Sequence, residues 1–281
     1  MKCEEQSNLK RVISPLRYPG GKSKALKRIL PFIPLDFSEY REPFLGGGSV
    51  FIALKQLHPD ATYRINDLNY DLYCFWNSLK NSVDELINEV MKLRSSIKNG
   101  RKLYEKLASS NEDADGFHRA VRFYILNRIT YSGTVDSGGY SSEAFEKRFT
   151  VTCMDRLKPL SNLLKDVAIT HENYENMLFE DGKNVFIYMD PPYWKSMKSK
   201  LYGKNGNLHK SFNHKQFATN VEKCKHRWLA TCDNSKKMRY LLRFANTYTY
   251  PWEMQYGMNN VKKKRAGKGQ ELFIMNYKPN L

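Results

Sequence analysis

Residues 184–194 read Asn-Val-Phe-Ile-Tyr-Met-Asp-Pro-Pro-Tyr-Trp, an apolar run that stops at an acid, two prolines and two aromatic residues. The run is short, contains β-branched residues and is bounded on both sides, which predicts a buried strand. Pro191 and Pro192 cannot continue a hydrogen-bonded ladder, so the strand ends there and Asp190 lies at its carboxyl end. Open α/β sheets bind their ligands at that edge.

The tetrapeptide from Asp190 to Tyr193 suits attack by an exocyclic amine on a methyl group. A carboxylate oxygen of Asp190 and the carbonyl oxygen of Pro191 would accept the two N–H bonds of an adenine amine and leave its lone pair free. Tyr193 would stack on the base and hold that lone pair in line with the methyl donor. The alternative is a stiff turn without chemistry, because Asp and paired prolines are ordinary turn residues.

Composition limits the class of protein. A chain of 281 residues with 41% hydrophobic content can bury a sizeable core, so we expect a soluble protein of one large domain or two. Its net charge of +17 indicates an anionic partner, with nucleic acid preferred to a membrane surface. The sequence shows neither an apolar signal segment nor a run of transmembrane length, and we expect cytoplasmic residence.

The five cysteines are an odd number without CxxC spacing, which indicates a reducing compartment. Cys224 and Cys232 lie near His209, His214 and His226 in the sequence, so a zinc site is the alternative to free thiols. We expect no bound metal.

A first glycine turn, Tyr18-Pro19-Gly20-Gly21-Lys22, runs into a helical pattern at residues 24–30. Gly21-Lys22-Ser23 matches the end of a phosphate-binding loop, but Leu16 stands where that loop requires glycine, which excludes a nucleotide triphosphatase. Two interpretations remain: a backbone that a ligand approaches closely, with Lys22 available to a carboxylate, or simply a basic helix start.

A second glycine turn, Gly46-Gly47-Gly48-Ser49, lies between a predicted strand at residues 39–45 and a predicted helix at 50–57. This order opens a nucleotide-binding unit, and its spacing suits a cofactor without a pyrophosphate. A second strand at residues 62–67 ends in Asp67, the expected anchor for ribose hydroxyls. Taken singly, Asp67 is also a candidate helix N-cap.

From about residue 71 to 165 the alternation of strands and helices stops. Helices are predicted at 84–93, 103–107 and 117–129, followed by a glycine- and serine-rich loop at 130–142. Basic helices with an aromatic loop fit a nucleic-acid reader, and a lid over a small-molecule site is the alternative. Further strands are expected at 166–174, 184–190, 227–233 and 270–277.

Together these motifs resemble the Dam-type DNA adenine-N6 methyltransferases (D12 class, α group), which use S-adenosylmethionine. The family's aromatic-x-Gly-Gly-Lys signature is similar to residues 18–22, and its glycine motif to residues 42–51. Its Asn-Asp strand end is similar to Asn66-Asp67, and its catalytic motif to residues 190–193. The likeness extends from Arg17 to Tyr277.

The resemblance implies an α/β fold, with a Rossmann-like S-adenosylmethionine-dependent methyltransferase sheet and an inserted helical DNA-recognition subdomain. Residues 1–71 and 166–281 would form the catalytic domain, and residues 72–165 the inserted target-recognition domain. The implied function is site-specific methylation of N6 of a flipped adenine in double-stranded DNA. Asp rather than Ser before Pro-Pro-Tyr favours adenine over cytosine N4. The alternatives are a catalytically idle DNA-binding protein on this fold and an RNA adenine methyltransferase.

The resemblance also implies three groups of site residues. The catalytic group is Asp190, Pro191, Pro192 and Tyr193. The cofactor group is Tyr18, Gly20, Gly21, Lys22, Glu42, Phe44, Gly46, Gly48, Asp67, Asn173 and Asp190, where Asn173-Tyr174 replaces the family's Asp-Phe. The DNA group is Arg128, Tyr131, Ser132, Lys262, Lys263, Lys264 and Arg265, although a charge run such as 262–265 is also typical of a solvated face.

Residues 127–133 resemble the family's hook, which enters the gap left by the extruded base, with Ser132 in place of the usual Asn. Residues 134–138 lack the Arg-Tyr-Asn or Arg-Val-Asn sequence of GATC-specific members, so the resemblance does not extend to GATC specificity and the target sequence stays open. We also expect a cognate restriction endonuclease as a partner, and we expect the protein to be a monomer or a weak dimer.

Overall fold

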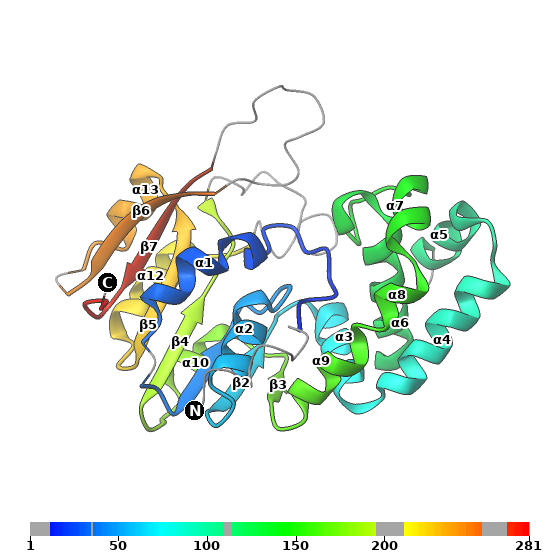
Figure 1. Ribbon diagram of the computed structural model, residues 1–281. Helices are drawn as coiled ribbons and strands as arrows, with labels where there is room; N and C mark the ends of the chain where they lie inside the picture. The colour runs from blue at the N-terminus through cyan, green and yellow to red at the C-terminus, as the bar shows by residue number, and fades with distance from the viewer. Residues whose placement is uncertain are drawn as a thin grey trace.

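The computed structural model describes residues 12–34, 36–109, 114–194, 211–244, 246–254 and 269–280. Within them one seven-stranded sheet has the order β3-β2-β1-β4-β5-β7-β6 (Figure 1). Its strands are β1 (Glu39–Glu42), β2 (Thr62–Asn66), β3 (Ala168–Thr170), β4 (Val185–Met189), β5 (Arg227–Asp233), β6 (Tyr248–Met254) and β7 (Gly269–Met275).

The strand order reverses in the middle of the sheet. β1 pairs in parallel with β2 on one side and with β4 on the other. This reversal is the switch point of a doubly wound sheet, where ligands bind beyond the carboxyl ends of the strands. β7 lies antiparallel between β5 and β6. The predicted Rossmann-like α/β fold is confirmed.

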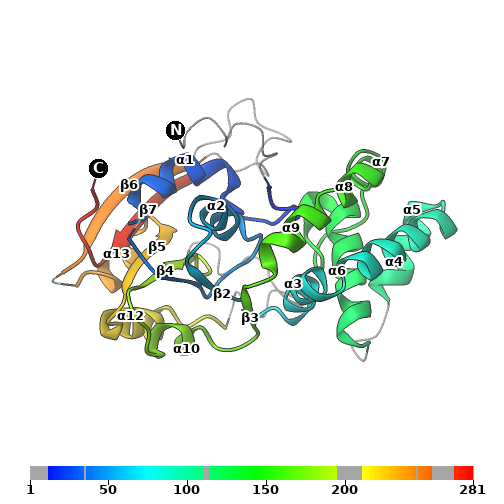
Figure 2. The same ribbon diagram turned by 60° about the horizontal axis from the view of Figure 1, so that its bottom comes forward.

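β4 is buried on both faces. Val185, Ile187 and Met189 pack into one core layer, and Phe186 and Tyr188 pack into the other. Helices cover both sides of the sheet (Figures 1 and 2), and a parallel sheet covered in this way needs apolar residues on both faces. This accounts for the unbroken apolar run in the sequence.

The helices of the two layers come from different parts of the chain. One layer holds α1 (Leu26–Ile29) and α2 (Ser49–Leu57), with the 3-10 turns η2 (Lys22–Ala25) and η3 (Leu30–Phe32) beside α1. The other layer holds α10 (Tyr174–Phe179), α12 (His214–Lys223) and α13 (Lys236–Leu241).

The remaining helices lie beside the sheet, between β2 and β3 in the chain (Figure 1). They are α3 (Tyr70–Asn81), α4 (Val83–Ser96), α5 (Gly100–Ala108), α6 (Gly116–Ile129), α7 (Ser142–Arg148), α8 (Val151–Met154) and α9 (Leu157–Leu164). One apolar core runs from Tyr40 of β1 through Trp76 of α3 to Tyr124 of α6, so these helices and the sheet share packing. The expected insert boundaries at residues 72 and 165 stay a prediction.

Arg41 of β1 is a fully buried cation that fixes the end of α10. Its guanidinium donates to the carbonyl oxygens of Met177, Glu180 and Asp181 at 2.9, 2.7 and 3.0 Å, and to Glu39 at 2.6 Å. Carbonyls at a helix carboxyl end lack partners within the helix, so a cation there satisfies them.

We expect Arg41→Met to lower the free energy of unfolding by about 3 kcal/mol, because it removes the donor from the buried Met177 carbonyl and the charge partner from Glu39. Urea unfolding measures this loss. Arg64→Met on β2 is the matched control, because the ion pair of half-buried Arg64 with exposed Glu180 is worth only about 0.5 kcal/mol. Equal losses in the two variants would contradict the role given to Arg41.

Candidate active site

Asp190 follows β4 directly, and other side chains hold both oxygens of its carboxylate. Lys22 Nζ donates to Oδ2 at 2.5 Å, and the Thr231 hydroxyl donates to Oδ1 at 2.6 Å. Lys22 is buried and also donates to the carbonyl oxygen of Gly20 at 3.0 Å. The Asp190 side chain remains 21% exposed, so it is oriented by its partners and still open to a ligand.

The carbonyl oxygens of the two prolines after Asp190 differ in whether another residue hydrogen-bonds to them. The Nε2 atom of His214 lies 2.8 Å from the carbonyl oxygen of Pro192. In the described part of the chain, no donor lies within hydrogen-bond distance of the carbonyl oxygen of Pro191. The acceptor left for a ligand beside Asp190 is therefore the oxygen of Pro191.

Tyr193 is held at its hydroxyl and across its ring. The hydroxyl donates to Glu271 Oε2 at 2.6 Å, and Glu271 is a buried residue of β7. Lys22 Nζ lies 5.0 Å from the ring centroid, within the range of a cation–π contact. The ring is thus oriented in the protein before any base arrives.

Tyr18 packs its ring on the second glycine turn. A Cβ atom at Gly46 would lie 2.8 Å from the Tyr18 ring, and one at Gly48 would lie 2.9 Å from the ring of Trp76. Both glycines also have left-handed backbones, with φ of +50° and +65°. Space and conformation both require glycine at these two positions, and the turn brings Tyr18 beside α2.

Asp67 follows β2 and fixes the same glycine turn. Its carboxylate accepts from the backbone N–H of Gly46 at 2.8 Å and of Asn69 at 2.9 Å. The N-cap of α3 is Asn69, whose side chain accepts from Leu72 N, so the helix-cap interpretation of Asp67 is wrong. Leu68 is 56% exposed beside it and offers an apolar surface next to the acid.

Glu42 ends β1 beneath the site and is fully buried. Burial raises the pKa of its carboxyl to about 8; the negative charge of Asp190 acts in the same direction, and the bond from the Tyr40 hydroxyl opposes it. At neutral pH Glu42 is therefore mainly protonated in the folded chain. Burial also raises the pKa of Asp67.

This protonation makes stability depend on pH. Folded Glu42 keeps its proton up to about pH 8, whereas the unfolded carboxyl loses its proton near pH 4.5. Between these two pH values the folded state binds more protons than the unfolded state. The free energy of unfolding should therefore decrease as pH rises from 4.5 to 8. The slope is up to about 1.4 kcal/mol per pH unit from this group. Glu42→Gln resembles the protonated form and should flatten the profile, as urea unfolding from pH 5 to 8 will show. Parallel profiles for the two proteins would contradict the raised pKa.

Phe44 and Asn173 lie on the α10 side of the site. The Phe44 ring lies 5.3–6.1 Å from the rings of Tyr174, Phe212 and Phe217. Asn173 is the N-cap of α10, and its Oδ1 accepts from Glu175 N at 3.2 Å. Asn173 therefore has a structural bond already, and its contact with a cofactor stays a prediction.

The hook emerges from the end of α6. Thr130 pairs with Tyr140 in an isolated antiparallel bridge, and η4 (Tyr131–Gly133) follows Thr130. Tyr131 is 63% exposed, and Ser132 has φ of +55°. A left-handed backbone is easier for Asn than for Ser, which gives a physical reason for the family's usual Asn at this position.

The base of the hook is tied to the residue beside Tyr18. Asn127 accepts from Arg17 N at 2.9 Å and donates to the carbonyl oxygens of Arg17 and Gly133. Arg128, expected to contact DNA, is buried and donates to the carbonyl oxygens of Pro15 and Arg148. In this structure Arg128 supports the hook, and its contact with DNA stays a prediction.

Other expected site features have less structural support. Lys262, Lys263, Lys264 and Arg265 lie outside the described residues, as does His209. Over the ranges described, no group of three or more His, Cys, Asp and Glu side chains could hold a metal ion. No helix in those ranges combines the length and the apolar character needed to cross a membrane.

The chain is similar to proteins of known families. Residues 18–258 match the family model described as D12 class N6 adenine-specific DNA methyltransferase. The chain belongs to this family. The matched range contains Tyr18, both glycine turns and residues 190–193, which the structure gathers at one edge of the sheet.

Named relatives of this D12 class enzyme include the type II methyltransferase M.MjaIII of Methanocaldococcus jannaschii, 31% identical over 196 residues. The type II methyltransferase M.CviBI of Paramecium bursaria Chlorella virus NC1A is 28% identical over 184 residues. Each of these matches covers 63% of this chain and 68% of the relative. The DNA adenine methylase of Escherichia coli K12 is 28% identical over 190 residues, which cover 63% of this chain and 64% of that protein.

The structure also brings residues to the site of this D12 class enzyme that the sequence did not assign to it. Thr231 and Glu271 hold Asp190 and Tyr193, and His214 holds the carbonyl oxygen of Pro192. A signal was present for two of them, because Thr231 and Glu271 are polar residues that lie next to apolar residues in predicted strands. A buried polar residue needs a partner, and here the partners are Asp190 and Tyr193, which the sequence predicts to be catalytic.

Proposed function

We propose that this D12 class enzyme transfers a methyl group from S-adenosylmethionine to N6 of an adenine extruded from double-stranded DNA. The observation that supports this most is the pairing of two acceptors at the end of β4. The Asp190 carboxylate is oriented by Lys22 and Thr231, and the carbonyl oxygen of Pro191 beside it is open to a ligand. Together they can accept both N–H bonds of one amine.

The residues beside the glycine turn fit S-adenosylmethionine. Asp67 is an acceptor for ribose hydroxyls, exposed Leu68 offers a surface to the purine, and Tyr18 lines the turn. When bound, this cofactor supplies a methyl group activated by its sulfonium. Lys22 belongs to the same set, and its ion pair with Asp190 connects the cofactor side to the amine side.

The chain's own residues then have distinct roles in transfer. Asp190 and Pro191 would fix the amine, and the Asp190 carboxylate would stabilise the positive charge that develops on nitrogen as the N–C bond forms and the S–C bond of the donor breaks. The methylated nitrogen then releases one N–H proton, and S-adenosylhomocysteine is the other product. Tyr193 stacks on the base and sets the line of attack. Thr231 and Lys22 are positioning residues, because they act by holding the Asp190 carboxylate.

The target base must leave the duplex, because N6 is engaged in pairing and cannot be aligned within the stack. Exposed Tyr131 and Ser132 at the tip of the hook are the side chains we propose to enter the gap. A cognate restriction endonuclease, cytoplasmic residence and a monomeric or weakly dimeric state stay predictions.

Expression in cells that lack adenine methylation, followed by long-read mapping of modified bases, tests the proposal. We expect N6-methyladenine at one consistent sequence. An absence of modified adenine in DNA, with N6-methyladenine in RNA instead, would assign an RNA substrate. No modification in either would favour a DNA-binding protein without catalysis.

A further inference from the structure

A cluster of cations lies on and beside α13, and none of its residues has a role in the proposed methyl transfer. From Asn234 to Trp252 the chain carries four cations and no acid. With the tyrosine among them, they form a surface that we name the α13 patch: Lys236, Lys237, Arg239, Tyr240 and Arg243. Within the described residues, none of its cations forms an ion pair with an acid.

The α13 patch is open to solvent. Tyr240 is 65% exposed, and Lys236, Arg239 and Arg243 are exposed as well. Lys237 Nζ and Arg243 Cζ lie 5.8 and 5.5 Å from the Tyr240 ring centroid. Like charges gathered in this way repel one another until a polyanion neutralises them. The charge and the phenol hydroxyl both suit phosphate oxygens.

The α13 patch adjoins the catalytic segment. α13 begins just after β5, the strand that supplies Thr231 to Asp190. Lys237 Nζ also lies 5.7 Å from the ring centroid of Trp194, the residue that follows Tyr193. Figures 1 and 2 show α13 on one side of the carboxyl end of β4, with α6 and α7 on the other.

We infer that the α13 patch binds the phosphate backbone of the DNA on the side of the target adenine away from the inserted helices. The inference rests on the proposed DNA substrate. A duplex reaching from the hook across the end of β4 would meet the patch next. The protein would then bind the DNA backbone on both sides of the extruded base. These two contacts would keep the duplex in place while the base is out of the stack.

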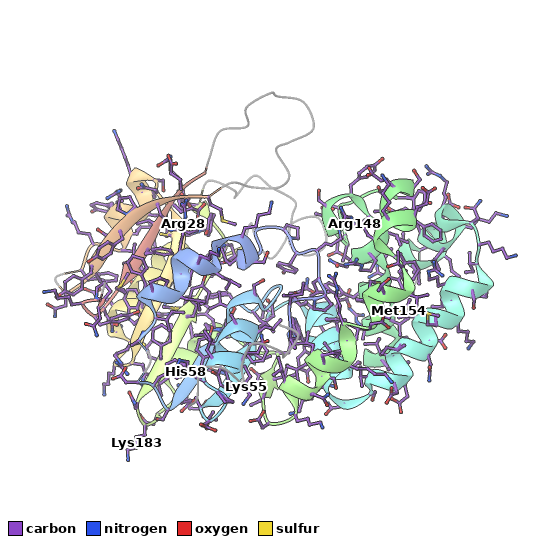
Figure 3. The ribbon with its side chains drawn as sticks, in the orientation of Figure 1. Arg28, Lys55, His58, Arg148, Met154 and Lys183 are labelled. Carbon is purple, nitrogen blue, oxygen red and sulfur yellow. The ribbon has the colours of Figure 1, made fainter. Side chains whose placement is uncertain are left out.

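Two variants of equal charge test the inference. The patch variant combines Lys236→Gln, Lys237→Gln and Arg243→Gln. The control combines Lys183→Gln, Lys223→Gln and Lys225→Gln, exposed cations near the amino ends of β4 and β5. Figure 3 shows Lys183 at the end of the molecule remote from the α13 patch. Thermal melting and S-adenosylhomocysteine binding check that both variants are folded.

The readouts are affinity for a duplex carrying the mapped target sequence, its salt dependence, and ethylation interference along both strands. We expect the patch variant to bind about tenfold more weakly, with a salt slope shallower by about 0.9 for each phosphate that the variant no longer neutralises. Its interference pattern should lose the phosphates on one side of the target adenine only. The control should match wild type.

Equal affinities and slopes for the two variants, or an unchanged interference pattern, would overturn the inference and leave the proposed function standing. A patch that served a protein partner instead would give that result. If wild type itself fails to bind the duplex, the proposed function fails and the inference fails with it.

Discussion

Asp190→Ala should lower kcat by about 10³-fold while the protein still binds DNA and S-adenosylhomocysteine. The expected loss is large because this one carboxylate both accepts an N–H bond of the amine and faces the charge that develops on nitrogen. Lys22 and Thr231 hold it at 2.5 and 2.6 Å, so both of its oxygens are fixed in position before a ligand binds. Single-turnover transfer of a labelled methyl group to duplex DNA measures the loss.

Asp190→Asn is the companion variant, because it keeps the volume of the side chain and removes its charge. We expect it also to be strongly impaired, since an amide cannot form the ion pair with Lys22. Binding of S-adenosylhomocysteine and the melting temperature separate a defect in chemistry from a defect in folding. An Asp190→Ala protein with near-normal turnover would remove Asp190 from the mechanism.

Tyr193→Ala should lower kcat by about 10- to 100-fold, because stacking of one base on an aromatic ring is worth about 1–3 kcal/mol. Tyr193→Phe should stay within about threefold of wild type in turnover, since the ring and its contact with Lys22 remain. Tyr193→Phe should instead lower the free energy of unfolding, because buried Glu271 loses the 2.6 Å hydrogen bond from the Tyr193 hydroxyl.

The comparison of the two Tyr193 variants separates stacking from the hydrogen bond. Steady-state kinetics with duplex DNA gives the turnover, and urea unfolding gives the stability. If Tyr193→Phe were as slow as Tyr193→Ala, the hydroxyl rather than the ring face would carry the effect. Equal turnover of wild type and Tyr193→Ala would exclude stacking from the mechanism.

The strands that carry the site could be predicted from sequence because each combines a short apolar run with a sharp end. β4 stops at two prolines, and β1 stops before a glycine turn, so their carboxyl ends were located to within a few residues. β6 (Tyr248–Met254) was not predicted. It is an edge strand with Pro251 in it and most of its residues are not buried, so it lacks the apolar signal of a central strand.

The partners of Asp190 and Tyr193 were harder to predict. Thr231 and Asp190 lie 41 residues apart, and only the pairing of β4 with β5 brings them together. Arg128 shows the opposite case. Its charge and its place in the hook motif indicate a DNA contact, whereas burial against α7 and the amino-terminal segment gives its guanidinium backbone carbonyls as partners. Sequence indicates which residues are polar, and packing decides which of them reach solvent.

In the proposed mechanism Asp190 and Pro191 bind the N6 amine of adenine during methyl transfer. The most direct test is to incubate DNA with purified protein and S-adenosylmethionine that carries a deuterated methyl group, and then to analyse the nucleosides by mass spectrometry. We expect labelled N6-methyldeoxyadenosine from wild type, and none from an Asp190→Ala protein that still binds the same DNA. Label on cytosine, or equal label on adenine from both proteins, would contradict this mechanism.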